Sequence, residues 1–225
     1  MGLKSKEQAG GGRFISIIGD TFREKVEEGT DGAIKREYKD RDGNPKIKWE
    51  KHHGSLEAML TSIEFKDGNF GEQAIVTLTD VDEVYTLFLS TDDDYFTSLA
   101  KILPNIDLSQ EVELEPYDYI KKKTGKPKRG IGVMQGGVKL FSYYWDNDNK
   151  KNVHGLPQSD KNSSKEGHAD KYDSDDWTLY WLKVKKFLKG TIKDMDFSAT
   201  SGVKPMKVSD KDIDLEPDDN DDLPF

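Results

Sequence analysis

Six cations fall within nine residues in the middle of the chain, and no acid lies among them: Lys121, Lys122, Lys123, Lys126, Lys128 and Arg129. Such a density suits a phosphate backbone, because each phosphate contact releases condensed counterions. Gly125 and Pro127 place the run on a loop, and Tyr117 and Tyr119 lead into it on one face of a strand. A solvated basic loop or a localisation-type run is the alternative. The neighbouring rings favour nucleic acid.

The segment 137–145 alternates as a β-strand does. Its even positions form an ordinary core face: Val138, Leu140, Ser142 and Tyr144. Its odd positions combine one cation with three rings: Lys139, Phe141, Tyr143 and Trp145. Exposed rings are unfavourable unless something stacks on them, and nucleobases do so for about 1–3 kcal/mol each. Alternatively, a later loop or helix covers the rings and they belong to the core. Trp49 and Trp177 are weaker stacking candidates.

The C-terminal segment is strongly acidic and closes on an apolar hook. Residues 209–225 carry a net charge of −7, and the last eight are Asp218, Asp219, Asn220, Asp221, Asp222, Leu223, Pro224 and Phe225. Such a tail can occupy the protein's own cationic groove as a phosphate mimic. Its hook can instead enter a partner's pocket, with the terminal carboxylate on an Arg or Lys. A plain solubilising tail, the third possibility, has no need of the hook.

The tip resembles that of a known family. Asp221-Asp222-Leu223-Pro224-Phe225 is similar to the Asp-Asp-x-Pro-Phe end of bacterial single-stranded-DNA-binding proteins, and an acidic tail closing on Phe resembles that of the tailed-bacteriophage proteins. The resemblance implies a role in DNA replication, recombination and repair. It also implies that the tip (Asp218, Asp219, Asp221, Asp222, Leu223, Pro224 and Phe225) competes with DNA and recruits partners such as a polymerase, helicase, primase or nuclease.

The chain departs from the bacterial members of that family. It lacks their Gly/Gln/Pro-rich linker and short body, and it carries an N-terminal extension, a long loop and a further helix. These differences favour the phage type, and with it a monomer or dimer over a tetramer.

Composition excludes several classes of protein. The 225 residues hold 34 Lys+Arg and 43 Asp+Glu, for a net charge of −9, so the body before residue 209 carries only −2. The absence of cysteine excludes a disulfide scaffold, a Cys-based zinc site and a Cys nucleophile. No apolar run approaches 18 residues and the start lacks an apolar signal region, which predicts a soluble cytoplasmic protein that makes no membrane contact.

We expect no catalytic residues, metal or cofactor. The four histidines are scattered, and neither a phosphate-binding loop, a nucleophile elbow nor an HExxH motif occurs. The acids at 80–83 and 92–94 read as a hairpin turn and a helix start. A metal-dependent nuclease is therefore a minor alternative. A non-DNA-binding adaptor, or a DNA mimic that docks its tail on replication enzymes, is another, although a mimic gains nothing from the basic run.

The elements that would position these residues follow from periodicity. Strands are predicted over 13–18, 55–65, 74–79, 84–89, 111–119 and 137–145. A helix capped by Thr91 ends at Pro104-Asn105, and a second amphipathic helix covers 176–189. The order β-β-β-α-β-β is that of a five-stranded OB barrel. An unrelated small antiparallel α+β domain is the alternative.

The predicted fold class is mainly β with minor α, an elaborated OB-fold. Residues 1–12 form a flexible N-terminus. Residues 13–197 form the DNA-binding domain, with its barrel core at 46–145 and a mobile loop at 146–176. Residues 198–225 form a disordered acidic tail. Single-stranded DNA is the expected ligand.

Overall fold

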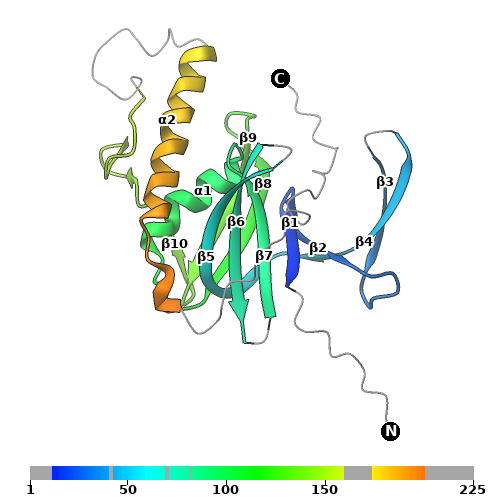
Figure 1. The fold of residues 1–225 in the computed structure, drawn as a ribbon. Helices are drawn as coiled ribbons and strands as arrows, with labels where there is room; N and C mark the ends of the chain where they lie inside the picture. The colour runs from blue at the N-terminus through cyan, green and yellow to red at the C-terminus, as the bar shows by residue number, and fades with distance from the viewer. Residues whose placement is uncertain (1–11, 41–42, 69–70, 82, 160–173, 201–225) are drawn as a thin grey trace.

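The computed structural model describes residues 12–40, 43–68, 71–81, 83–159 and 174–200 (Figure 1). This part of the chain is mainly β, with two α-helices, as predicted. Ten strands form one sheet in the order β10-β9-β8-β5-β6-β7-β1-β2-β4-β3. Their bounds are β1 (Arg13–Ile18), β2 (Thr21–Val26), β3 (Ile34–Lys39), β4 (Pro45–His53), β5 (Leu56–Gly68), β6 (Gly71–Asp80), β7 (Glu83–Ser90), β8 (Val112–Ile120), β9 (Pro127–Gln135) and β10 (Val138–Leu140).

The predicted meander is present as β5, β6 and β7, joined antiparallel. β5 pairs with two partners: Leu56–Ala58 lie opposite β8, and the strand from Met59 onward lies opposite β6. The register shifts between Leu60 and Ser62, and a bulge of this kind bends a strand. β5 therefore connects the meander to the β8–β9 hairpin.

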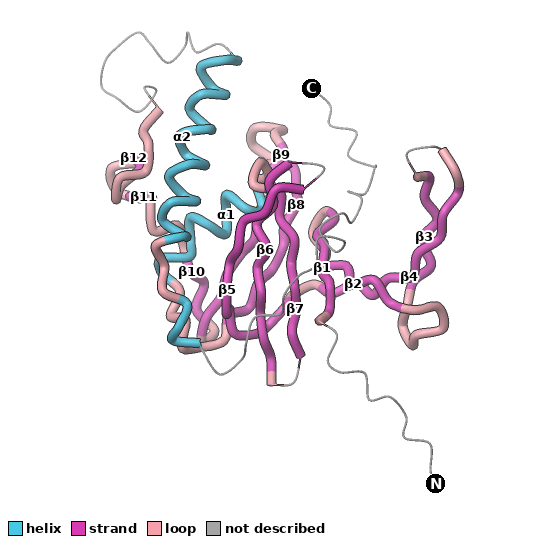
Figure 2. The backbone as a smooth tube through the Cα atoms, viewed as in Figure 1, coloured by secondary structure: helices cyan, strands magenta, loops and turns pink. Residues whose placement is uncertain are grey.

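The sheet is open, and the closed barrel is not formed by its hydrogen bonds. β7 pairs in parallel with β1, so the sheet continues into β2, β4 and β3 and ends there. The core lies on the sheet face that carries Ala58, Leu78, Leu87 and Val133, whose side chains are fully buried. α1 (Asp94–Ile102) and α2 (Ser174–Lys193) lie on the same side of the molecule, away from β3 (Figure 2).

Two strands lie in the charged segment 19–45, where no element is predicted. β2 and β3 flank β4 and form an antiparallel arm with it. Their side chains are largely charged on both faces, so neither strand has the apolar alternation by which strands are recognised. Gly43 lies in the turn between β3 and β4, where Gly43 N donates to Asp40 O and Gly43 has a φ of +80°.

The prediction of one strand over 137–145 is wrong. β10 spans only Val138–Leu140, Phe141 and Ser142 have no regular structure, and Tyr143 and Tyr144 form a turn. Trp145 then begins β11 (Trp145–Asp146), which pairs with β12 (Lys151–Asn152). β9 is not predicted from the sequence, because Gly130 and Gly132 lower the β-propensity of this segment. Gly136 and Gly137, with φ of +56° and +76°, make the tight turn from β9 to β10.

The expected mobile loop at 146–176 is only partly a loop. The β11–β12 hairpin lies within it, and Leu156 is 4% exposed and Ser159 is 7% exposed. Residues 160–173 lie outside the described residues, as do 1–11 and the acidic tail from residue 201 onward.

Both predicted helices are present, with bounds and an N-cap residue that differ from the prediction. α1 ends at Ile102, and Pro104, the predicted stop, lies in the 3-10 turn η1 (Leu103–Asn105) that follows it directly. Its cap is Asp93, whose carboxylate accepts from Tyr95 N, and not Thr91, whose hydroxyl donates to Glu72 O. α2 buries Val184, Leu188 and Ile192, and a short 3-10 turn, η4 (Phe197–Thr200), follows it. Neither described helix is long and apolar enough to cross a membrane.

Asp93→Ala should lower the free energy of unfolding by about 1 kcal/mol, because the N-terminal amides of α1 lose their acceptor. Asp92→Ala is the matched control: Asp92 forms an exposed pair with Lys185, and its loss should cost under about 0.5 kcal/mol. Urea unfolding of both variants measures the difference. Equal losses would contradict the assignment of the cap.

Candidate functional site

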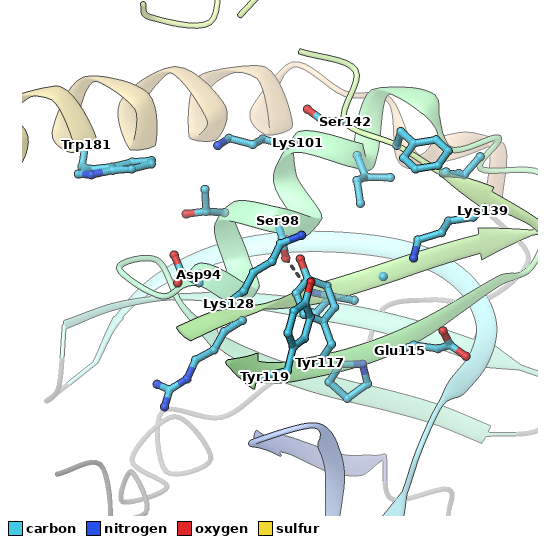
Figure 3. Close-up of a pocket in the computed structure, with 18 residues that line it drawn as sticks. Asp94, Ser98, Lys101, Glu115, Tyr117, Tyr119, Lys128, Lys139, Ser142 and Trp181 are labelled. Carbon is cyan, nitrogen blue, oxygen red and sulfur yellow. Dashed lines mark hydrogen bonds between the residues drawn. The ribbon is translucent and has the colours of Figure 1, made fainter. Parts of the chain in front are cut away.

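A groove of about 590 Å³ lies where α1 approaches the β8–β9–β10 part of the sheet, with α2 at its far rim (Figure 3). β8 contributes Tyr117 and Tyr119, and β9 and β10 contribute Lys128 and Lys139. α1 contributes Ser98 and Lys101, and α2 contributes Trp181. Rings and ammonium groups from five elements, β8, β9, β10, α1 and α2, therefore line one groove.

Two tyrosines form its aromatic floor. Tyr117 and Tyr119 are two residues apart on β8 and so share a face, with ring centroids 5.9 Å apart at 43°. Lys128 lies opposite Tyr119 in the β8–β9 register, and its Nζ is 5.5 Å from the Tyr117 centroid and 5.9 Å from that of Tyr119. Burial raises the pKa of Tyr117, against the opposing effect of Lys128, so its hydroxyl stays neutral. The pair is an uncharged stacking surface beside a cation.

Glycine on β9 makes room for these rings. Tyr117 lies opposite Gly130, and a Cβ at Gly130 would clash with Tyr117 Oη and lie 2.7 Å from Ser98 Oγ. Ser98 Oγ also accepts from Ile131 N at 2.6 Å, which ties α1 directly to the β9 backbone. The missing side chain therefore allows both the helix and the tyrosine to approach the strand.

Trp181 and Lys101 form the opposite wall, and the sequence did not identify either. Lys101 Nζ lies 5.5 Å from the Trp181 ring centroid (Figure 3). Burial lowers the pKa of Lys101, and Asp94 partly opposes the effect. Trp181 lies within the amphipathic helix that the sequence predicts over 176–189, and its side chain is 48% exposed. Only the packing of α2 against α1 brings it to the groove, and no local signal in the sequence predicts that contact.

The charges of the groove are unevenly compensated. Arg129 Nε donates to Asp118 Oδ2 across the hairpin at 2.8 Å, so its charge is shared with a carboxylate. Lys128 and Lys139 form no ion pair with any described residue. Asp94 and Glu115 also line the groove. The available positive charge is therefore that of Lys128, Lys139 and Lys101.

The structure gathers half of the predicted DNA-contacting residues. Those that line the groove are Tyr117, Tyr119, Lys128, Arg129, Lys139 and Phe141. The four lysines at 121–123 and 126 are exposed at the hairpin turn between β8 and β9 instead. Tyr143 is stacked on His154, with centroids 4.1 Å apart, and Trp145 lies on β11. Trp49 is on β4 and Trp177 is at the start of α2.

The predicted tail residues, from Asp218 to Phe225, lie outside the described residues. Within the described ranges, no three His, Asp or Glu side chains gather as a metal site would require. Comparison of the chain with protein-family models, curated proteins and solved structures finds no match.

Gly130→Ala should cost about 1–3 kcal/mol of stability and displace Tyr117, because the added methyl group overlaps its hydroxyl and that of Ser98. Gly132→Ala is the matched control, since the nearest atom to its added Cβ, Glu115 O, is at 3.5 Å. Thermal unfolding and tyrosine fluorescence of the two variants test this. A harmless Gly130→Ala would mean that α1 does not approach β9 so closely.

Proposed function

We propose that this protein binds single-stranded DNA without sequence preference and does not act as an enzyme. One observation carries the proposal: the Tyr117–Tyr119 pair lies beside Lys128 in a groove whose other wall is Trp181 over Lys101. Rings accept the faces of unpaired bases, and interleaved ammonium groups accept the phosphates between them. Stacking on base faces with contacts to phosphates reads no base edge, so it supports binding independent of sequence.

The strand order supports an OB-type framework. A three-stranded meander, β5–β6–β7, is followed by α1 and then by the β8–β9 hairpin, whose first strand returns to pair with β5. OB-folds bind oligonucleotides on their strands and between their loops, including the loop between the fourth and fifth strands. In this chain that loop is the β8–β9 turn with its lysines. In a closed barrel β9 would pair with β7. Here β9 instead forms a hydrogen bond with Ser98 of α1, through Ile131 N.

The acidic tail completes the proposal. Its resemblance to the tips of single-stranded-DNA-binding proteins supports recruitment of replication, recombination and repair proteins through the residues from Asp218 to Phe225, in a bacterial or phage-infected cytoplasm. The proposal assigns no metal and no cofactor.

Tyr119→Ala and Lys128→Gln should weaken binding in different ways. Stacking of one base on a ring contributes about 1–3 kcal/mol to binding, so loss of the Tyr119 ring should lower the affinity for oligo-dT about tenfold. The salt dependence should stay unchanged, because no charge is removed. Loss of one phosphate contact should lower the slope of log K against log salt by about 0.7. Titration of tryptophan fluorescence at three salt concentrations measures both quantities.

Lys183→Gln is the control for the lysine variant, because Lys183 is exposed on α2 and does not line the groove. It should keep the wild-type slope. Normal oligo-dT binding by both groove variants would refute the proposed groove, and equal affinity for duplex of the same length would refute the preference for single strands.

Binding should also fall as the pH rises toward the alkaline range. Burial holds the pKa of Lys101 below its usual 10.5, and a phosphate beside the ammonium would raise it again, so binding takes up a proton. Affinity for oligo-dA, measured from about pH 7 to pH 10, should decline in the wild type and much less in Lys101→Arg, which stays charged. Identical pH profiles would contradict a phosphate contact at Lys101.

A further inference from the structure

The arm formed by β2, β4 and β3 carries a second surface suited to anions. In Figure 2 it extends away from α1 and α2, beyond β1. Directly opposed residues share a face of a sheet, so the arm's registers define which side chains stand together. On one face, here called the arm face, they are Arg23, Lys25, Ile34, Arg36, Tyr38, Lys46, Lys48, Glu50 and His52.

The arm face has a large excess of positive charge. Five Lys and Arg side chains stand on it with one carboxylate, that of Glu50, and Asp40 at the following turn lies 3.7 Å from Lys46. The opposite face of the same strands is more balanced, since Lys35 pairs with Glu37 and Lys51 lies opposite Glu24. The excess therefore belongs to one side and is not a general property of the arm.

Glu50 fixes the cations in place. It is 3% exposed, and its carboxylate lies 3.1 Å from Lys48, 3.3 Å from Arg23 and 3.9 Å from Arg36. Burial alone would raise its pKa, but the three cations outweigh burial and lower it, so Glu50 stays ionised. One carboxylate cannot neutralise three cations. Arg23 Nε is moreover buried without a hydrogen-bond partner in the described part of the chain.

An aromatic ring lies among these cations. The Tyr38 centroid is 5.2 Å from Lys48 Nζ and 5.8 Å from Arg36 Cζ. Arg and Lys around a ring reproduce the combination found in the groove, and guanidinium groups match the planar geometry of phosphate oxygens. This pairing of stacking ring and phosphate ligands favours a nucleic acid over an acidic peptide as the occupant.

The arm face and the groove tyrosines lie on the same side of the one continuous sheet. Arg23 lies opposite Ser16, which shares its face with Phe14, and Phe14 lies opposite Thr86. From Thr86 the register passes through Thr77 and Ser62 to the side that bears Glu57, Glu113 and Tyr117. β9 and β4 are seven strand spacings apart in the sheet order, a path of roughly 34 Å along the sheet at ~4.8 Å each, and the sheet curls so that β2 and β8 also approach each other. A stacked strand that advances ~3.4 Å per nucleotide covers this span with about ten nucleotides.

We propose that the arm face is a second contact for nucleic acid, binding phosphates of the same single strand whose bases stack in the groove. The inference rests on the proposed function. It predicts that a long oligonucleotide, which reaches both surfaces, gains affinity from the arm, whereas a short one does not.

The test compares oligo-dT of about six and about twenty nucleotides, a range that brackets the ten-nucleotide span. The test variant is Arg36→Gln/Lys46→Gln in the full chain, which removes the most distant of the three Glu50 cations and keeps the two nearer ones, Lys48 and Arg23. Two lost phosphate contacts should lower the salt slope for the long oligonucleotide by about 1.4 and its affinity by about tenfold or more. Binding of the short oligonucleotide should change less than about twofold, because it reaches only the groove.

Lys39→Gln/Lys51→Gln is the matched control, because it removes the same charge from the opposite face of β3 and β4. Tyr38→Ala, which removes no charge, should weaken the long oligonucleotide and keep its slope. Thermal midpoints of all variants establish that they fold.

The inference is overturned if Arg36→Gln/Lys46→Gln binds the long oligonucleotide with the affinity and salt slope of the wild type. It is also overturned if the variant loses affinity equally for both lengths. Tighter binding of the long oligonucleotide by this variant would overturn it in favour of the chain's own acidic tail as the occupant of the arm face. Failure of the wild type to bind either oligonucleotide would instead refute the proposed function.

Discussion

The close approach of α1 to β9 is the contact on which the groove depends. Ser98 Oγ accepts from Ile131 N, and Gly130 leaves the space in which Ser98 and Tyr117 meet. This contact satisfies an edge amide of the strand, as a further strand would. It also holds α1 close enough to the sheet for Lys101 to line the same groove as Tyr119. A bulkier residue at 130 would lift the helix and separate the two walls.

The sequence predicts the apolar centre of the fold well. β5, β6 and β7 are rich in β-branched and aromatic residues with clear alternation, and the Pro104 stop of α1 is explicit. It fails where composition conceals an element: β9 contains Gly130 and Gly132, and β2 and β3 are charged on both faces. The pairing of β7 with β1, which keeps the sheet open, depends on residues far apart in the chain and leaves no local pattern.

The candidate site was predictable to the extent that it is local. Tyr117, Tyr119 and Lys128 follow from the strand period and the basic run. Tyr143 and Trp145 were assigned to the same strand as Lys139, but that strand ends at Leu140, and the turn after it carries Tyr143 to His154. Trp181 enters through helix packing alone. A site assembled from five elements is therefore only half predictable from the sequence.

The parallel pairing of β1 with β7 also bears on the order in which the protein can assemble. Arg13 lies opposite Tyr85, so this register cannot form until the chain has been made beyond β7. Pairings over such sequence separations form slowly, since closing the intervening loop costs entropy before any contact forms. The arm, whose strands pair with near neighbours, can fold earlier around Glu50. During synthesis the N-terminal strands would then form a unit of their own before β7 is available to pair with β1, and β8, β9 and β10 join the sheet from the other side.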